Sequence, residues 1–452
     1  MTSQMILKTL ASTLVLTALM WVGQEVEATP IYAVRSANAC DTCHIEPLGW
    51  ANPEESKRFC TLDCNGCHVS STGGGLRTPT GEYYGRQVLP MWGDRPGDLG
   101  NPRDYLPEGY PEKGRYRLFE GFSGWWAGST RMQDIPKRLG DIDPEPKFSW
   151  GMDYRGAVYQ PMTITKDGEE AEDELAVFPM QADIYLSGRP LPNLVLYSNA
   201  GLKGARDRSE LPEGVADQVK EYLAVREVFV KVDRLPYNSY VRAGRFAPPF
   251  GWRIPDHTSF IRRDLGFDQN RQVFGLEGGY NPNYLFTNAA VFYQGLEDWP
   301  GDDGDEALGL AAIGGWRDLG WQLFGSLQYL DRSDDASNDD LTMGVSWGLN
   351  LFPAAYLGEL DYKRKMAESG DTDGLFAYHE LSYLVTRGLS AQLKYDYQDP
   401  DLNVLDDHRD RYTLGLQFEP YTYTQAMLQY RLNMQAKELT NHEILFMLHV
   451  WL

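Results

Sequence analysis

From about residue 148 to the C-terminus, apolar and polar side chains alternate in short segments. The run 412–418 places Tyr, Leu, Leu and Phe on one face and Thr, Gly and Gln on the other. The runs 321–329, 389–397 and 425–432 alternate in the same way. A period of two is typical of β-strands, because successive side chains point to opposite faces of a sheet. The pattern therefore predicts a mainly β domain.

The connectors between these segments alternate between short and long. Tight turns fall at 189–192, 235–236, 281–283, 318–320, 352–353, 386–388 and 420–421. Longer, mostly acidic connectors lie at 297–305, 331–340, 368–373 and 399–410. Barrels of bacterial outer membranes are built this way, with the tight turns in the periplasm, and the alternation argues against a water-soluble sandwich. We therefore predict a transmembrane antiparallel β-barrel over residues 148–452.

The number of strands follows from the end of the chain. About seventeen segments qualify if 115–130 is included, yet single-chain bacterial barrels have even numbers. The strand-like run 444–452 should follow a long loop and end in the periplasm. Counting back from it makes the segment near 148–163 the first wall strand, which predicts about sixteen strands around a water-filled lumen. Residues 111–147 would then be a connector or plug.

The first residues carry a different pattern. An apolar run from about Ile6 to Gly23 contains Lys8 as almost its only charge, and a small-residue cleavage signal ends at Ala28. This arrangement is typical of a secretory signal peptide, so we expect residues 1–28 to be removed. The mature chain would then reach an oxidising compartment, the outer membrane of a Gram-negative bacterium in the case of a barrel.

Two Cys-x-x-Cys-His motifs lie in residues 29–110, which we interpret as a small, mostly irregular or α-helical dihaem cytochrome c region. They are Cys40-Asp-Thr-Cys43-His44 and Cys64-Asn-Gly-Cys67-His68. In c-type cytochromes the two thiols of this motif bind the haem vinyl groups, and the His is the proximal iron ligand. We therefore predict two covalently bound c-type haems. Turns at 73–75 and 79–81 would pack near them.

The same cysteines allow other interpretations. Their spacing also fits a four-cysteine zinc site, and simple disulfides are a further alternative. The His that follows each cysteine pair and the oxidising compartment favour haem. Aromatic residues at 13% and a formal net charge of −22 are unusual for a soluble cytochrome, which links the motifs to the barrel.

The distal haem ligands stay open at this stage. Met91 is the nearest candidate after the second motif, and an ordinary apolar contact is its alternative role. Cys60 is either a buried or free thiol or a regulatory thiol or sixth ligand. Met447 and His449 fall on the lumen face of the last predicted strand, where they have structural roles or approach a haem. His408 lies among acidic residues of a long loop, as a cation ligand or a solvated side chain.

This architecture resembles the fused outer-membrane cytochrome c–porin proteins, the electron conduits of iron-oxidising bacteria. The resemblance covers the whole chain after the signal peptide and is specific in sequence at the haem motifs. Members of that family generally carry one haem, whereas this chain has two motifs. The run 242–251, Arg-Ala-Gly-Arg-Phe-Ala-Pro-Pro-Phe-Gly, is similar to a stretch of phosphate-selective-type porins and supports a porin barrel.

The resemblance implies electron transfer between a periplasmic carrier and an extracellular metal ion or other redox partner. Physically, electrons need redox centres to cross a hydrocarbon layer of roughly 30 Å. A second hypothesis is a porin whose haem region gates the lumen or senses redox state. A third is a haem peroxidase, against which stands the lack of a His/Arg pair near the motifs. We expect outer-membrane lipid around the barrel and no nucleic-acid partner, and an electron-transfer protein rather than an enzyme with a turnover substrate.

Overall fold

The described part of the chain is mainly the barrel and one segment in its lumen. A computed structural model describes residues 64–78, 92, 147–163, 175–203, 223–268, 271–282, 284–296, 306–318, 321–332, 339–351, 353–367, 370–386, 388–421, 423–436 and 438–451. The signal peptide, the first haem motif (Cys40, Cys43 and His44), Cys60 and Met91 lie outside these residues, and what we predict for them stays a prediction.

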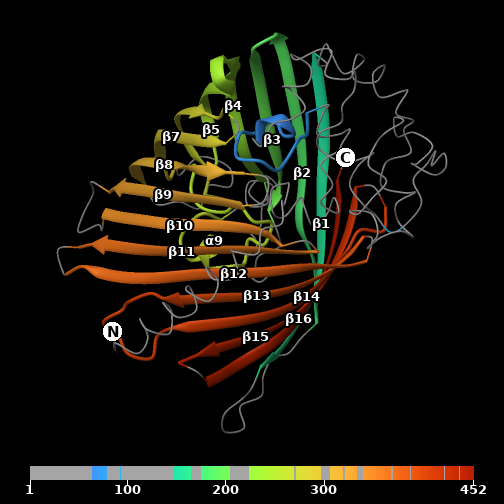
Figure 1. Ribbon diagram of the computed structural model, residues 1–452, viewed down its shortest axis with the longest axis vertical. Coiled ribbons are helices and arrows are strands. Elements are labelled where there is room, and N and C mark those ends of the chain that lie inside the picture. Colours follow the sequence, from blue (N-terminus) through green and yellow to red (C-terminus); the bar gives the residue numbers. More distant parts are fainter. Residues whose placement is uncertain are drawn as a thin grey trace, which may run out of the picture.

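In the described residues, sixteen strands form one closed antiparallel barrel, in which each strand pairs with its sequence neighbours and β1 pairs with β16 (Figure 1). The strands are β1 Phe148–Thr163, β2 Ala176–Leu191, β3 Leu194–Lys203, β4 Leu223–Leu235, β5 Ser239–Phe246, β6 Val273–Tyr280, β7 Leu285–Gln294, β8 Ala307–Arg317, β9 Trp321–Asp331, β10 Asp339–Leu351, β11 Ala354–Met366, β12 Thr372–Thr386, β13 Leu389–Asp399, β14 Arg409–Phe418, β15 Thr424–Gln435 and β16 Glu438–Trp451. Short helices are η1 Cys64–Gly66, η5 Pro236–Asn238 and α9 Phe260–Arg263.

The predicted barrel, its sixteen strands and its alternating connectors are confirmed, with one exception. A long loop before the last strand is wrong, because β15 ends at Gln435 and β16 begins at Glu438. Residues 433–435 and 438–443, which look like a polar loop in the sequence, belong to the paired strands, with Gln435 opposite Glu438. Strand ends that project beyond the apolar band can be polar on both faces, and this removes the alternation that marks a strand.

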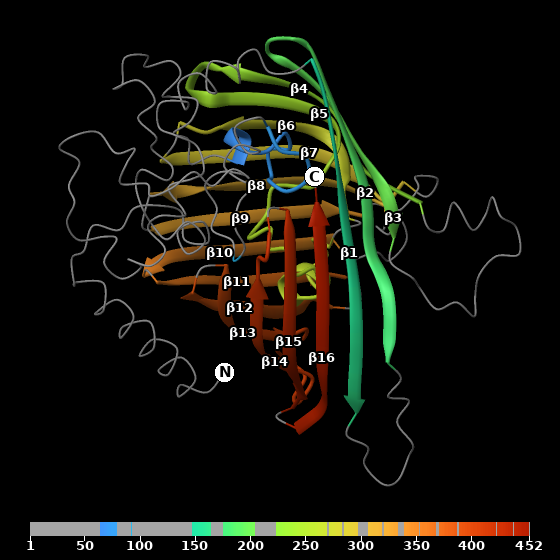
Figure 2. The ribbon, with the colours of Figure 1, turned by 90° about the vertical axis from the view of Figure 1, so that its right-hand side faces the viewer.

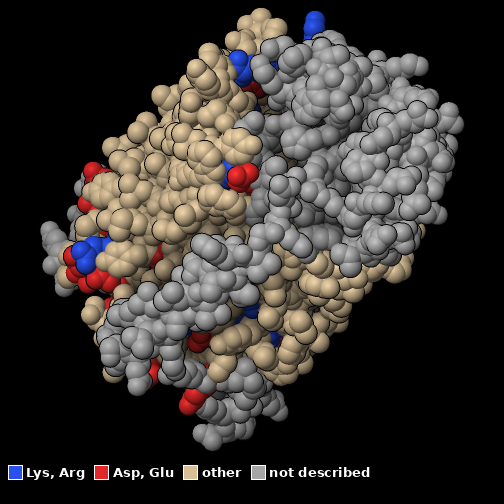
Figure 3. Space-filling model, viewed as in Figure 1, with Lys and Arg blue, Asp and Glu red and all other residues tan. Residues whose placement is uncertain are grey.

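The two faces of the wall differ in polarity. On β13, the side chain of Leu393 points outward and is 55% exposed, whereas its neighbour Lys394 points inward and is 4% exposed. On β16, Phe446 and Leu448 point outward, while Met447 lies on the inner face as predicted. Figure 3 shows an outer surface with few charged side chains, the largest group of which lies at the left of the view. Lipid can therefore cover the outer face.

Helices play a minor part in this fold. Among the described residues, no helix is both long and apolar enough to cross a membrane. The wall encloses two other segments: residues 64–78, which contain the second haem motif, and the described residues 247–268 and 271–272 of the β5–β6 connector, which contain α9 (Figure 2). We call them the motif segment and the lumen loop.

Candidate functional site

The second Cys-x-x-Cys-His motif forms one compact helical turn. Within η1 and just after it, the backbone N–H groups of Cys67 and His68 both donate to the carbonyl oxygen of Cys64, at 3.1 and 2.8 Å. The Cys64 side chain is exposed and Cys67 is half-buried. A turn that brings both thiols and the His together fits haem attachment, which stays a prediction for these residues.

After the motif, the chain folds back on itself. The N–H of Val69 donates to Leu76 at 3.0 Å, and the N–H of Thr78 donates to Cys67 at 3.0 Å. The reversal is made by Gly73, Gly74 and Gly75, whose φ angles are 80°, 73° and 60°. Side chains rarely adopt this region, so three glycines in succession allow the tight turn that the sequence predicts here.

His68 has the properties of a neutral ligand. Burial lowers its pKa to about 3, and the nearby positive charge of Arg77 acts in the same direction. Its Nδ1 atom is buried and makes no hydrogen bond to any described group. A neutral imidazole is the form that binds a metal, so the chemistry of His68 fits the predicted iron ligand.

Strand β4 contacts the motif segment through Lys231. The Lys231 ammonium donates to the carbonyl oxygen of Val69 at 2.6 Å and to the Asn65 side chain at 2.9 Å. Its side chain is almost fully buried, and the ammonium also lies 5.9 Å from the ring centroid of Tyr240. One wall residue therefore holds the motif from both sides, since Asn65 precedes Cys67 and Val69 follows His68.

A buried charge network lies beside this contact. Arg242 of β5 and Glu277 of β6 form a fully buried ion pair at 2.7 Å. Arg242 also donates to the Ser70 hydroxyl at 3.4 Å, and Ser70 donates to Glu227 of β4 at 3.3 Å. Arg253 of the lumen loop lies 3.9 Å from Glu227 and donates a hydrogen bond to Thr72. Glu227 thus joins the wall, the lumen loop and the motif segment.

Aromatic side chains complete the set of residues that contact the motif segment, which we call its seat. Tyr185 and Tyr197 lie under the glycine turn, and a Cβ atom on Gly75 would come within 2.7 Å of the Tyr197 hydroxyl. The Arg77 guanidinium lies 5.8 Å from the ring centroid of Tyr423 and 5.4 Å from that of Trp451. These last two residues belong to the end of the barrel that carries the tight turns.

The lumen loop crosses to the opposite wall, where a hydrogen bond, two ion pairs and an apolar cluster hold it. The N–H of Trp252 donates to Glu359 of β11 at 2.6 Å. The Asp256 carboxylate lies 3.3 Å from both Lys394 of β13 and Arg431 of β15. Burial alone would raise the pKa of Asp256, but Arg431 and Lys394 hold it well below its usual value. An apolar cluster formed with the wall covers the rest of the loop: Phe250, Ile254, Phe260, Ile261, Leu265, Phe267, Phe376 and Tyr378.

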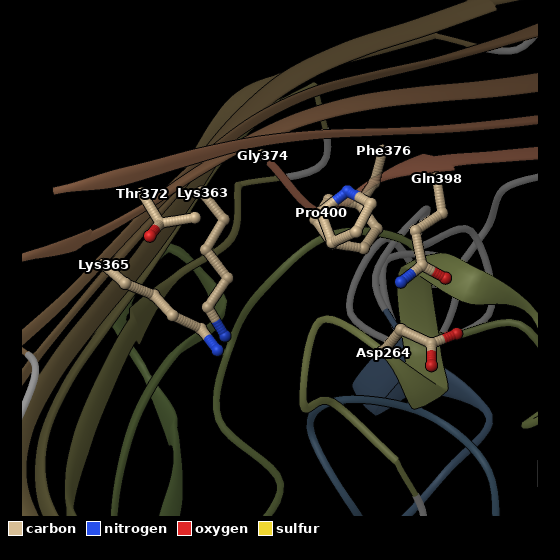
Figure 4. Close-up of a pocket in the computed structure, with 8 residues that line it drawn as sticks. All are labelled: Asp264, Lys363, Lys365, Thr372, Gly374, Phe376, Gln398 and Pro400. Carbon is tan, nitrogen blue, oxygen red and sulfur yellow. The ribbon is translucent and has the colours of Figure 1, made fainter. Parts of the chain in front are cut away.

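A cavity of about 170 Å³ lies between α9 and the long-loop ends of β11–β13. Figure 4 shows the ammonium groups of Lys363 and Lys365 side by side in it, with Asp264 and Gln398 on the other side. Lys363 pairs with Asp340 at 3.3 Å. The residues that line this cavity are distinct from those that touch the motif segment.

The other sequence candidates occupy separate places. His449 lies in the lumen, as predicted, with Nε2 2.9 Å from Asp153 of β1 and its ring 4.4 Å from Trp451. His408 lies 4.0 Å from Asp410 in a long connector. The described residues contain no cluster of three or more His, Cys, Asp and Glu side chains suited to hold a metal ion. Lys231 and Asp256 were not predicted from the sequence. The only signal for Lys231 is a charge on the polar face of a strand-like segment, and the only signal for Asp256 is a charge shortly after the porin-like run 242–251.

Comparisons with known proteins identify the type of barrel. No family model matches the chain, and no curated protein matches it. Among solved structures, it is similar to OmpF of Salmonella typhi in complex with daunomycin, at 11% identity, over 68% of this chain and 97% of that chain, with a TM-score of 0.50. An anion-selective porin from Comamonas acidovorans matches at 12% identity, over 68% and 99% of the two chains, with a TM-score of 0.50. OprB of Pseudomonas putida, in its high-pH structure, matches at 8% identity, over 71% and 98%, also with a TM-score of 0.50. At such low identity the likeness concerns the fold alone, and this fold is the sixteen-stranded barrel of outer-membrane porins.

Proposed function

We propose that this protein resides in the outer membrane and transfers electrons across it, using two covalently bound c-type haems. A periplasmic electron carrier would meet one end of the barrel, and an extracellular metal ion or other redox partner the other. The observation that carries the proposal is the seat of the second motif. Its turn contacts side chains on the inner face of the wall, among them Lys231 and Tyr197. A redox centre held there would lie inside the barrel, toward the end that carries the tight turns.

The residues of the motif segment have distinct parts in this proposal. Cys64 and Cys67 would attach the haem, and the neutral imidazole of His68 would bind its iron. When bound, the haem supplies a one-electron redox centre. The protein supplies position: the hydrogen bonds of Thr78 and Val69 close the turn, and the wall fixes it. The first motif would place a second centre nearby along the chain.

A porin with a gated lumen is the second candidate, and one observation favours it. The motif segment and the lumen loop both lie inside the barrel and touch each other through Arg253 and Thr72. Two segments in one lumen restrict diffusion, so release of either could open a path for small solutes. Ion conductance across a planar bilayer separates the candidates, because a gated porin conducts in one redox state, whereas a conduit transfers electrons with little ion current in both.

Haem content is the first test. The purified protein should give a c-type pyridine haemochrome spectrum with two haems per chain, and replacing Cys40 and Cys43 by Ser should halve it. A protein that holds zinc and no haem would contradict the proposal.

Electron transfer is the second test. An external acceptor should oxidise a reduced dye that is enclosed in proteoliposomes containing the protein, and His68→Ala should abolish this oxidation. His408→Ala is the matched control, because His408 lies in a connector away from the motif segment. Equal rates in the wild type and His68→Ala would exclude a conduit through the second motif.

A further inference from the structure

We propose that Lys231 is a positioning residue for the second motif, and that its buried charge makes the haem of this motif the more easily reduced of the two. The inference rests on the proposed function, because it concerns a haem that the motif would hold. It adds an order of reduction potentials, and with it a thermodynamic gradient between the two sites.

The geometry supports the positioning part. Lys231 is 2% exposed, and its ammonium donates to Asn65 at 2.9 Å and to the carbonyl oxygen of Val69 at 2.6 Å. Asn65 stands between the two cysteines of the motif, and Val69 follows the iron-binding His68 directly. A single side chain on a rigid strand therefore fixes the turn on both sides of its ligand. Such support determines the orientation of a metal-binding imidazole.

The surrounding charges support the electrostatic part. The described contacts bring four cations to the motif segment: Lys231, Arg242, Arg253 and its own Arg77. Two carboxylates accompany them among the described contacts, Glu227 and Glu277, the latter paired with Arg242. The Lys231 charge lies in a buried place, where charges interact more strongly than in water. Reduction adds a negative charge to a haem, so a positive surrounding favours the reduced form.

The first motif contains a negative charge in its own sequence, opposite in sign to the cations that contact the second motif. Asp41 stands in it at the position that Asn65 occupies in the second motif. A carboxylate between the two cysteines disfavours the addition of an electron, while an amide is neutral. The residues inside the two motifs therefore differ in the same direction as the Lys231 charge acts, and we expect the second site to have the higher potential.

Single-haem proteins make the test direct. Full-length protein with Cys40→Ser and Cys43→Ser carries the second haem alone, and Cys64→Ser with Cys67→Ser leaves the first. Potentiometric titration of the haem absorption should give the higher midpoint for the second haem. In that background, Lys231→Met and Lys231→Gln should lower the midpoint, and Lys231→Arg should restore it. Glutamine keeps a hydrogen-bond donor without the charge, so it separates charge from position.

Lys394→Met is the matched control, because Lys394 is another buried lysine of the lumen that binds Asp256 instead of the motif segment. The midpoint potential of the second haem in Lys394→Met should equal that of the single-haem protein without this change. An unchanged midpoint in both Lys231→Met and Lys231→Gln would overturn the electrostatic part. Full haem loading with an unaltered low-spin resonance spectrum in Lys231→Met would overturn the positioning part. Absence of haem in every protein would instead contradict the proposed function.

Discussion

The barrel holds its two inner segments on opposite walls and by different forces. The motif segment lies on β2–β5, where Lys231 and two tyrosines contact main-chain atoms and a glycine turn. The lumen loop lies on β11–β15, where the Asp256 carboxylate meets two cations and an aromatic cluster covers the rest. The first seat combines close packing with hydrogen bonds between charged side chains and uncharged groups of the segment, whereas the second rests on paired charges.

This difference matters because the two kinds of contact fail in different ways. A buried ion pair that loses one partner leaves an uncompensated charge, which is costly. The glycine turn of the motif segment, in contrast, is close-packed and has no room for an extra atom. We therefore expect the lumen loop to respond to the loss of a carboxylate and to pH, and the glycine turn to respond to volume.

The largest effect should come from Asp256→Ala. Lys394 and Arg431 would lose a buried carboxylate at 3.3 Å, and we expect a loss of about 3 kcal/mol in the free energy of unfolding. Urea unfolding in detergent or lipid measures it. Asp264→Ala is the control: its pair with Arg263 is 3.0 Å long but partly exposed, and should contribute less than about 1 kcal/mol. Equal losses in the two variants would contradict the comparison.

The stabilisation that Asp256 provides should depend on pH. Its pKa lies well below the usual value in the folded protein, so its stabilisation is complete above that usual value, about 4, and is lost as the pH falls below it. The difference in unfolding free energy between the wild type and Asp256→Asn should therefore be constant from neutral pH down to about pH 5, and then shrink. A difference that already declines between pH 8 and pH 6 would contradict this assignment.

The sequence contains enough information for the barrel wall. Alternation is strong wherever one face meets lipid and the other a polar lumen, as in the pair Leu393 and Lys394. The prediction failed at 433–435 and 438–443, where most residues are polar and the alternation of a strand is lost. The motif itself was visible because its chemistry requires fixed spacing.

The seats of the inner segments could not be predicted in this way. Lys231 binds Asn65 and Val69 across more than 160 residues, and no local pattern encodes such a contact. Asp256 looks like any other polar loop residue, and its partners come from two different strands. Periodicity tells which face a side chain occupies, while the identity of its partner depends on how the loop folds inside the barrel.

The next largest loss of stability should come from the glycine turn of the motif segment. Gly75→Ala should open the motif segment, because the new Cβ would meet the Tyr197 hydroxyl at 2.7 Å. Gly74→Ala is the matched control: its φ of 73° is also unfavourable for alanine, but no atom lies within 4 Å of the new Cβ. Both variants lose about 1–2 kcal/mol to backbone strain, and Gly75→Ala loses about 1–3 kcal/mol more. Trypsin cleavage after Arg77 should be faster in Gly75→Ala, and equal rates would contradict a close-packed seat.

The smallest effect tests how much one cation–π contact contributes to the seat of the motif segment at the tight-turn end. The Arg77 guanidinium lies 5.4 Å from the Trp451 ring centroid, a cation–π contact worth about 0.5–1 kcal/mol. A double-mutant cycle with Arg77→Met and Trp451→Leu isolates it, with the opening free energy taken from hydrogen exchange at the Thr78 amide, which donates to Cys67. A coupling of this size means that the Arg77–Trp451 contact is a minor part of this seat. A coupling above about 2 kcal/mol would place Arg77 beside Asp256 as a charge anchor, and the two seats would then differ less than their contacts indicate.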